Sequence, residues 1–344
     1  MRTQAGFFLG LRRMRKPNLV RRLARWWQLK RRLGATPRKT PNKQPHDIEQ
    51  QIAKLRVRGM AIPDGEESAA KHQLAHINYY RLRGYWMSME VEIAAAGEHQ
   101  FQQGTTFAQV ADLYGFDRKL RLEINGAIER VEVSLRTQWA RVLACHHGTV
   151  AHRQAVAFDG RKHGELLERL ERHYATRNEI FLKHYLNRGE EPPVWVMCEI
   201  LSMGDLSRWM AAVMRRQLRQ QIASAYDLDE AVLTSFVQHL AYVRNVCAHH
   251  GRLWNRDLTK RVRLPRQPLV LGKQLNRSTE HAARIYNTLT LLGWMMARIN
   301  PESGWLQRTR TLIESQAPER IAVMGFPSAW QEFPVWSNGA ARNG

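Results

Sequence analysis

The chain is poor in cysteine, in long apolar runs and in glycine-rich loops, and each shortage excludes a class of protein. Its three cysteines among 344 residues, Cys145, Cys198 and Cys247, include no close-spaced pair, which argues against a disulfide framework or a four-cysteine zinc module. No apolar run approaches the roughly 18 residues that cross a bilayer, and the start of the chain has no secretory signal pattern. The sequence offers no glycine-rich turn between a strand and a helix, which excludes nucleotide-dependent dehydrogenases and P-loop enzymes. We therefore expect a cytoplasmic protein with no membrane partner.

Acidic residues are missing from the first 46 positions, which hold fourteen lysines and arginines. The net charge of the chain is +22, so about +8 is left on the remaining body. Charge of this size indicates a polyanionic partner, either a nucleic acid or an acidic membrane surface. We interpret residues 1–45 as a basic arm and a proline-rich linker. The arm is either a solvated extension or an auxiliary contact to RNA or lipid headgroups.

Apolar residues after the linker recur at intervals of three and four, which predicts an all-α fold. We expect helices over residues 116–148 and 228–251, each closed by a glycine, and another over 190–218 that starts at a double proline. Residues 285–299 are typical of an amphipathic core helix. The expected divisions are the arm and linker (1–45), an N-terminal helical subdomain (46–110), the main helical domain (111–300) and a C-terminal tail (301–344).

Residues 244–256, RNVCAHHGRLWNR, contain the side chains that metal-free RNA cleavage requires. Histidine can take or give a proton near neutral pH, and arginine stays charged and grips phosphate through two parallel bonds. Asn245 and His249 are about 40° apart around a helix, so the amide can orient the imidazole. Arg244 is about 140° from His249 on an undistorted helix, which favours a meeting of the two groups across a subunit boundary. We predict that Arg244, Asn245 and His249 are catalytic, with His250 as an alternative acid or base.

Two other interpretations fit the same stretch. A cationic helix end interacts favourably with the helix dipole, and Gly251 would supply its cap. Alternatively, Cys247, His249 and His250 could join residues 145–147 in a zinc site, although neither cluster has the usual two-residue spacing of paired ligands. Residues 145–147 also end an apolar helix, and we interpret them as a helix terminus.

Further arginines and aromatic residues predict contacts to unpaired RNA by charge and stacking. The predicted RNA-binding residues are His250, Arg252, Trp254, Asn255, Arg256, Arg118, Arg121, Tyr79, Tyr80, Arg81 and Arg83. The aromatic residues at 77–86 fit packing between helices at least as well, and Trp254 also fits a role in anchoring its loop to the core.

Residues 244–256 resemble the signature of the Abi-like (AbiD/AbiF-type) abortive-infection family of bacterial phage-defence proteins. Stretches at 77–86, 116–136 and 192–209 are similar to blocks of that family and stand in the same order. The resemblance covers residues from about 40 to about 300. It implies an all-α HEPN-type helical bundle, with an N-terminal helical subdomain and a basic arm, in which Arg244, Asn245 and His249 form the catalytic motif.

The same resemblance implies RNA cleavage that needs no metal or other cofactor and that leaves a 2′,3′-cyclic phosphate and a 5′-hydroxyl. Because each chain holds one full motif, it implies a homodimer, and kinship implies a small non-coding RNA as a partner. The leading hypothesis is an endoribonuclease toxin of anti-phage defence. The alternatives are a non-catalytic RNA-binding module that holds a structured small RNA, and a membrane-acting toxin that uses the basic arm.

Overall fold

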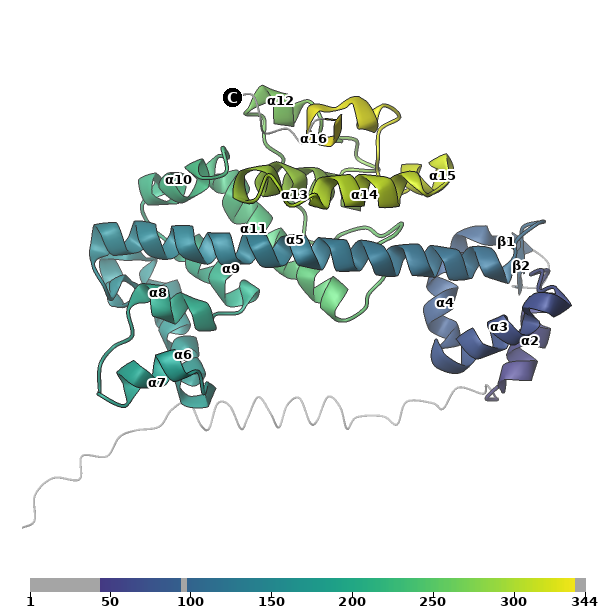
Figure 1. Cartoon of the computed structure of the whole chain (residues 1–344), viewed down its shortest axis with the longest axis horizontal. Helices are drawn as coiled ribbons and strands as arrows, with labels where there is room; N and C mark the ends of the chain where they lie inside the picture. Colours follow the sequence, from purple (N-terminus) through teal and green to yellow (C-terminus); the bar gives the residue numbers. More distant parts are fainter. Residues whose placement is uncertain (1–43, 94–97, 338–344) are drawn as a thin grey trace, which may run out of the picture. The chain divides into compact units, whose positions relative to one another are not determined.

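The computed structural model describes residues 44–93 and 98–337 (Figure 1), so the basic arm and linker predicted for residues 1–45 lie almost entirely outside the described residues. The chain divides into two units, residues 1–50 and 51–344. In the first unit the N–H of Asp47 donates to Gln50 Oε1 at 3.0 Å, and the N–H of Gln50 donates to Asp47 Oδ1 at 2.7 Å. This reciprocal pair caps the start of α2, Ile48–Val57.

The described residues are mainly helical, which confirms the all-α prediction. The sheet among them is a hairpin of β1, Glu90–Ile93, and β2, Glu98–Phe101, paired antiparallel. The other α-helices are α3 (Asp64–His76), α4 (Tyr79–Trp86), α5 (Phe107–His147), α6 (Gly160–Thr176), α7 (Ile180–Leu186), α8 (Val194–Met197), α9 (Met203–Ala212), α10 (Arg216–Ser224), α11 (Glu230–Ala248), α12 (Leu269–Gly272), α13 (Ile285–Ile299), α14 (Trp305–Glu314), α15 (Pro318–Ala322) and α16 (Pro334–Ser337). Short 3-10 turns are η1 (Met87–Met89), η2 (Ala151–Arg153), η3 (Ala155–Ala157), η4 (Cys198–Ile200) and η5 (Trp330–Glu332).

The longest helix, α5, runs through the second unit and contacts helices on both sides (Figure 1). Its 41 residues span about 60 Å. Thr106 and Gln109 form a capping box at its start, and Gly148, with a φ of 79°, ends it. The helix predicted from residue 116 thus ends where expected, but it begins at Phe107 because the capping box lies upstream.

Two helices that pack on α5 confirm one prediction and correct another. α11 lies within the helix expected over residues 228–251. α13 was expected to be an amphipathic core helix: its place in the core is confirmed, but the expected exposed side is missing, because every residue from Ile285 to Met296 is buried. α14 and α16 pack on this helix and cover the side that would otherwise face solvent.

The helix predicted over residues 190–218 is interrupted, which corrects that prediction. The backbone becomes extended at Leu201, and Ser202 then caps α9 by accepting a bond from the N–H of Asp205 at 3.1 Å. A serine that caps a new helix competes successfully with continuation of the old one. The result is α8, η4, α9 and the start of α10 in place of one helix.

Residues after 300 were expected to form a tail, but the described part of that stretch, to Ser337, is packed. Trp305, Trp330 and Trp336 are 0 to 2% exposed. A Cβ at Gly293 of α13 would stand 3.0 Å from Leu306 and Val335, so α14 and α16 approach α13 as closely as a glycine allows. These residues belong to the core of the second unit.

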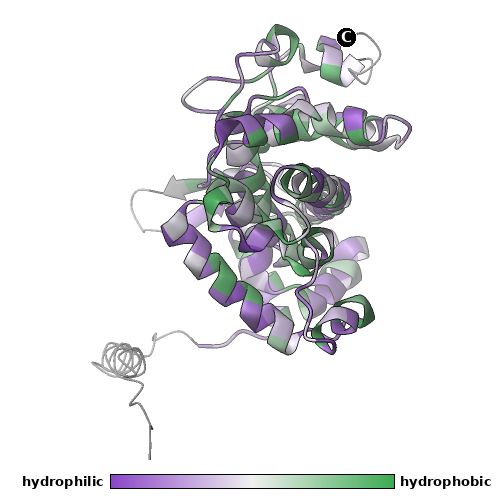
Figure 2. Ribbon diagram, turned by 90° about the vertical axis from the view of Figure 1, so that its left-hand side faces the viewer, coloured by the Kyte–Doolittle hydropathy of each residue, from purple (hydrophilic) through white to green (hydrophobic). Residues whose placement is uncertain are grey.

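Several helices are hydrophilic on one side and hydrophobic on another, as Figure 2 shows. Their apolar sides meet in a core that includes the fully buried Trp86, Trp139 and Trp209. Among the described helices, none has both the length and the apolar character needed to cross a membrane.

Candidate functional site

The motif at residues 244–256 lies where α11 ends and the chain turns back. The N–H of Gly251 donates to the carbonyl of Val246 at 2.7 Å, and the N–H of His250 donates to that of Cys247 at 3.0 Å. This bond pair closes a Schellman-type helix end. His250 is the left-handed residue, with a φ of 57°, so the expectation that Gly251 supplies the left-handed cap is wrong by one position. Gly251 instead permits a close approach, since a Cβ there would stand 3.0 Å from Val246 Cγ1.

The three predicted catalytic side chains, on Arg244, Asn245 and His249, are all exposed. The N–H of His249 donates to the carbonyl of Asn245 at 3.0 Å, so these two residues are one helical turn apart on the same face. Arg244 lies near α5: burial raises the pKa of Glu132, and the positive charge of Arg244 opposes that rise. Within one chain the helix therefore brings Asn245 and His249 together and directs Arg244 toward a different neighbour.

A buried carboxylate on α5, Asp117, holds the turn that follows the motif. The backbone N–H groups of Leu253 and Trp254 donate to Asp117 Oδ1 at 3.1 and 2.7 Å. The hydroxyl of Tyr85 donates to Oδ2 at 2.7 Å, and Arg121 forms an ion pair with the same oxygen. Asp117 is fully buried, so these bonds are not shared with solvent and fix the turn against α4 and α5.

Asp117 was not among the predicted site residues, and its neighbour Arg121 was misassigned. Arg121 is 4% exposed and its guanidinium is committed to Asp117, so the prediction that it binds RNA is corrected to a structural role. A signal for both was present in the sequence, because a carboxylate and an arginine four residues apart lie among apolar stripe positions of α5. Arg118, in contrast, is exposed, as its predicted role requires.

The first turn of α4 lies beside the end of α11. Arg81 Nη1 donates to the carbonyl of His250 at 2.6 Å, and the adjacent Tyr80 is 64% exposed. Tyr79 and Arg83 are half-buried. Tyr85 and Trp86 are buried, so the aromatic block at 77–86 packs at its end and presents Tyr80 and Arg81 at its start.

Trp254 is not available for stacking on a base, which corrects another prediction. Its side chain is 3% exposed, and Nε1 donates to the carbonyl of Arg320 at 3.0 Å. The indole anchors the turn to the core, which was the alternative interpretation. The adjacent Asn255 is also engaged, because Arg284 Nη1 donates to its Oδ1 at 2.8 Å.

The two arginines downstream of the motif histidines are half-buried. Arg252 lies against Gly84 of α4, where a Cβ would stand 3.7 Å from its Nε, and burial lowers the pKa of its guanidinium. Arg256 Nη1 donates to the carbonyl of Arg252 at 3.4 Å. Both remain partly accessible beside α11, and neither forms an ion pair among the described residues.

The cysteine and histidine clusters lie far apart. Burial raises the pKa of the Cys247 thiol to about 12, so the free thiol is not a thiolate nucleophile at neutral pH. Residues 145–147 end α5 about 45 Å along the helix from Asp117. In residues 44–93 and 98–337, no three His, Cys, Asp or Glu side chains are placed to hold a metal ion.

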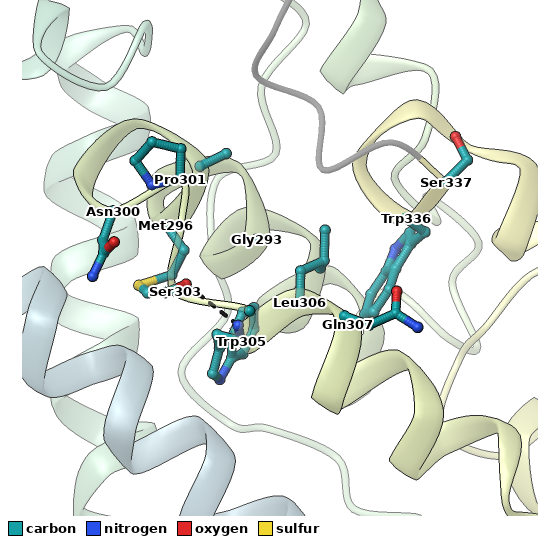
Figure 3. Close-up of a pocket in the computed structure, with 12 residues that line it drawn as sticks. Gly293, Met296, Asn300, Pro301, Ser303, Trp305, Leu306, Gln307, Trp336 and Ser337 are labelled. Carbon is teal, nitrogen blue, oxygen red and sulfur yellow. Dashed lines mark hydrogen bonds between the residues drawn. The ribbon is translucent and has the colours of Figure 1, made fainter.

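A pocket of about 290 Å³ lies elsewhere, between the end of α13, α14 and α16 (Figure 3). Its walls include Met296, Asn300, Trp305 and Trp336. None of the residues that line it carries an ionisable side chain, so it offers no acid or base for catalysis.

Comparison with protein families gives a match to the family described as Abi-like protein over residues 72–255, more than half of the chain. No curated protein and no solved structure matches it. The matched residues include α4, α5 and α11 in full and run into the motif at 244–256. The match therefore spans both the helices that build the site and the turn held by Asp117, and the chain belongs to the Abi-like protein family.

Proposed function

We propose that this Abi-like protein is a metal-independent endoribonuclease of the HEPN type that acts in abortive-infection defence against phage. Its substrate is RNA, and a small non-coding RNA restrains or directs it. His249 acts as general acid or base, Arg244 holds the scissile phosphate and Asn245 orients the imidazole.

The observation that carries the proposal is that Arg244, Asn245 and His249 are all exposed at the end of α11. The turn that follows this helix end is held by hydrogen bonds to buried Asp117. Exposed side chains on a rigid support can meet a macromolecular substrate without rearrangement of the fold. The exposed Arg81 and Arg118 add positive charge from α4 and α5.

The chemistry needs no metal. One imidazole takes the proton of the ribose 2′-hydroxyl, and the resulting oxygen attacks the adjacent phosphorus. The bond from phosphorus to the 5′-oxygen breaks, and a protonated imidazole gives its proton to that oxygen. The products are a 2′,3′-cyclic phosphate and a 5′-hydroxyl, and the guanidinium of Arg244 stabilises the charge that develops on the phosphate oxygens.

Two copies of the chain supply the complete site in this proposal. Arg244 and His249 are about 140° apart around α11, so the arginine of one copy and the histidine of the other act on the same phosphate. Each composite site then holds the arginine of one copy and the histidine of the other.

The first test replaces His249 with alanine. RNA cleavage, measured by mapping new 5′-hydroxyl ends, should fall by about 10²- to 10⁴-fold, because general acid–base catalysis contributes that much. His250→Ala is the matched control and should retain most of the activity, with folding of both variants checked by circular dichroism. Undiminished cleavage by His249→Ala would remove the mechanism.

The second test mixes two inactive variants, Arg244→Ala and His249→Ala. In a mixed dimer with composite sites, one site lacks both groups and the other is intact. Mixing and re-equilibration should therefore restore about a quarter of the wild-type activity. If no activity returns although mixed dimers form, each site is built within one chain.

RNA binding without cleavage is a second candidate, favoured by the separation of Arg244 from His249 within the chain. Such a protein would retain a defined small RNA through purification and leave it uncut. Sequencing of copurified RNA, together with the absence of new 5′-hydroxyl ends from the wild type, would replace the enzyme with this module.

A further inference from the structure

Beyond the motif, residues 258–266, here called the return segment, run back along α11 without helix or strand. The Nδ1 of His239 is hydrogen-bonded to the carbonyl of Lys260, and the N–H of Arg263 donates to Ser235 Oγ at 2.9 Å. His239 and Ser235 lie progressively farther from the end of α11, so the return segment is antiparallel to the helix. It therefore starts beside the candidate site and leads away from it.

Side chains of the return segment alternate between exposed and half-buried positions over residues 261–264. Lys260, Arg261, Arg263 and Arg266 are exposed. Val262 and Leu264, which stand between the arginines, are half-buried, and Leu258 and Pro265 are buried. This period of two over residues 261–264 is that of an extended chain, and it directs Arg261 and Arg263 to the same side, while Lys260 and Arg266 stand before and after it.

The exposed cations of the return segment are not paired with the carboxylates that the structure describes. Among the described residues, Lys260, Arg261, Arg263 and Arg266 form no ion pair. The carboxylate next to them in sequence, Asp257, is engaged by Arg284 Nε at 3.3 Å. Four unpaired cations on one short stretch repel one another, and a polyanion would remove that repulsion.

The backbone beneath these cations is firmly held. His239 is 2% exposed, and its Nε2 lies 2.8 Å from Thr288 Oγ1 on α13, so a buried side chain ties the segment to two helices. Arg277 donates to the carbonyl of Pro265. A Cβ at Gly272 would stand 2.8 Å from the carbonyl oxygen of Arg266, a contact that requires glycine. The backbone of the return segment is thus preorganised, which reduces the entropy lost on binding.

We infer that the return segment binds the sugar–phosphate backbone of a single RNA strand and leads that strand to the end of α11. That the strand ends at a cleavage site rests on the proposed function. Binding of the strand to the return segment does not depend on cleavage. A single extended segment with four exposed cations matches one strand. Tyr80 is exposed and stands next to Arg81, which bonds the carbonyl of His250, so it offers a face on which an unpaired base can stack. Contacts of this kind position RNA without reading its sequence.

The test measures binding in the full chain carrying His249→Ala, so that no probe is cut. The probe is a fluorescent single-stranded oligouridine RNA of about 12 nucleotides, within the range of single-strand site sizes. Arg261→Gln, Arg263→Gln and Arg266→Gln together should weaken binding by about 10- to 100-fold at 0.1 M salt. The slope of log affinity against log salt should become shallower by about 2, because each lost phosphate contact contributes about 0.7.

A matched control removes the same charge from α6 and α7, where Arg161, Arg172 and Lys183 are exposed. Changing these three to glutamine should alter affinity by less than about twofold. Replacing the three arginines of the return segment with lysine should preserve the salt slope.

Equal affinities for the two glutamine triples would overturn the inference. So would vesicles with anionic headgroups that bind through the return segment while the RNA does not. In a protein that cuts RNA, the return-segment triple should raise KM and leave kcat unchanged. If the wild type binds through this segment but never cuts, the inference stands and the proposed nuclease falls.

Discussion

At the scale of single residues, the position of the candidate site depends on Asp117, which is distant from the motif in sequence. Its carboxylate joins Tyr85 on α4, Arg121 on α5 and the turn after His250. A buried carboxylate and guanidinium tolerate the loss of either partner poorly, because the remaining charge is left in the core.

Asp117→Asn should therefore lower the free energy of unfolding by about 3 to 5 kcal/mol, since Arg121 keeps its buried charge without a counter-ion. Urea denaturation measures the loss. Asp257→Asn is the control, because this carboxylate is largely exposed and its pairing with Arg284 is worth less than about 1 kcal/mol. Losses of similar size in the two variants would contradict the role given to Asp117.

His250 provides a second prediction at this scale, because its left-handed backbone is costly for a residue with a Cβ. His250→Gly should raise the free energy of unfolding by up to about 1 kcal/mol, since glycine adopts this conformation without steric cost. Ala248→Gly, in the last turn of α11, is the control and should lower stability by about 0.5 kcal/mol or more. A loss of stability in His250→Gly would show that the imidazole makes an interaction worth more than the strain.

At the scale of elements, α11 has two tasks: its end carries the motif, and its body holds the return segment through His239 and Ser235. Local sequence signals located this helix and its end well, because an apolar stripe and a terminal glycine are local features. Local signals did not reveal the return segment. An arginine-rich stretch without helix or strand has the same local sequence pattern whether it is bonded to the core or is a solvated loop.

His239, which holds the return segment on α11, makes the stability of the protein depend on pH. Burial between α11, the return segment and α13 lowers the pKa of His239 to about 4 and outweighs the hydrogen bond to the carbonyl of Lys260, which acts in the opposite direction. The unfolded chain, with a histidine pKa of about 6.5, binds the proton first as the pH falls. The contribution of neutral His239 is thus complete above pH 6.5 and is lost between pH 6.5 and 4, by roughly 3 kcal/mol.

Urea unfolding at several pH values between 7.5 and 4 checks this prediction. His239→Gln should be less stable at pH 7.5 and should lack this part of the pH dependence. If the variant shows the same decline with pH as the wild type, another group causes it.

At the scale of the whole molecule, the second unit is one packed body from α3 to α16, and a boundary at residue 300 would cut through its core. A tail was expected because the family resemblance ends at about residue 300. The tryptophans in them are buried against α13 and α5, which only the assembled fold reveals.

A chain that ends at residue 300 should therefore fail to fold, because it uncovers the apolar residues of α13 and deletes buried Trp305 and Trp336. A chain that ends at residue 337 keeps both and should remain folded. Yield of soluble protein and cooperative thermal unfolding distinguish the two truncations. A stable, cooperative chain ending at residue 300 would restore the predicted tail.

The sequence by itself determined the all-α class, the extent of α11 and the motif at 244–256, because helical periodicity, caps and clustered side chains are properties of neighbouring residues. Only the tertiary structure placed Asp117 beneath Leu253 and Trp254, 136 and 137 positions away, and so turned Arg121 and Trp254 from predicted RNA contacts into buried supports. It also covered α13 on every side and left the arginines of the return segment exposed. Whether a side chain is buried, and which group it pairs with, depends on residues distant in the chain. A local sequence pattern does not specify which distant residue packs against it.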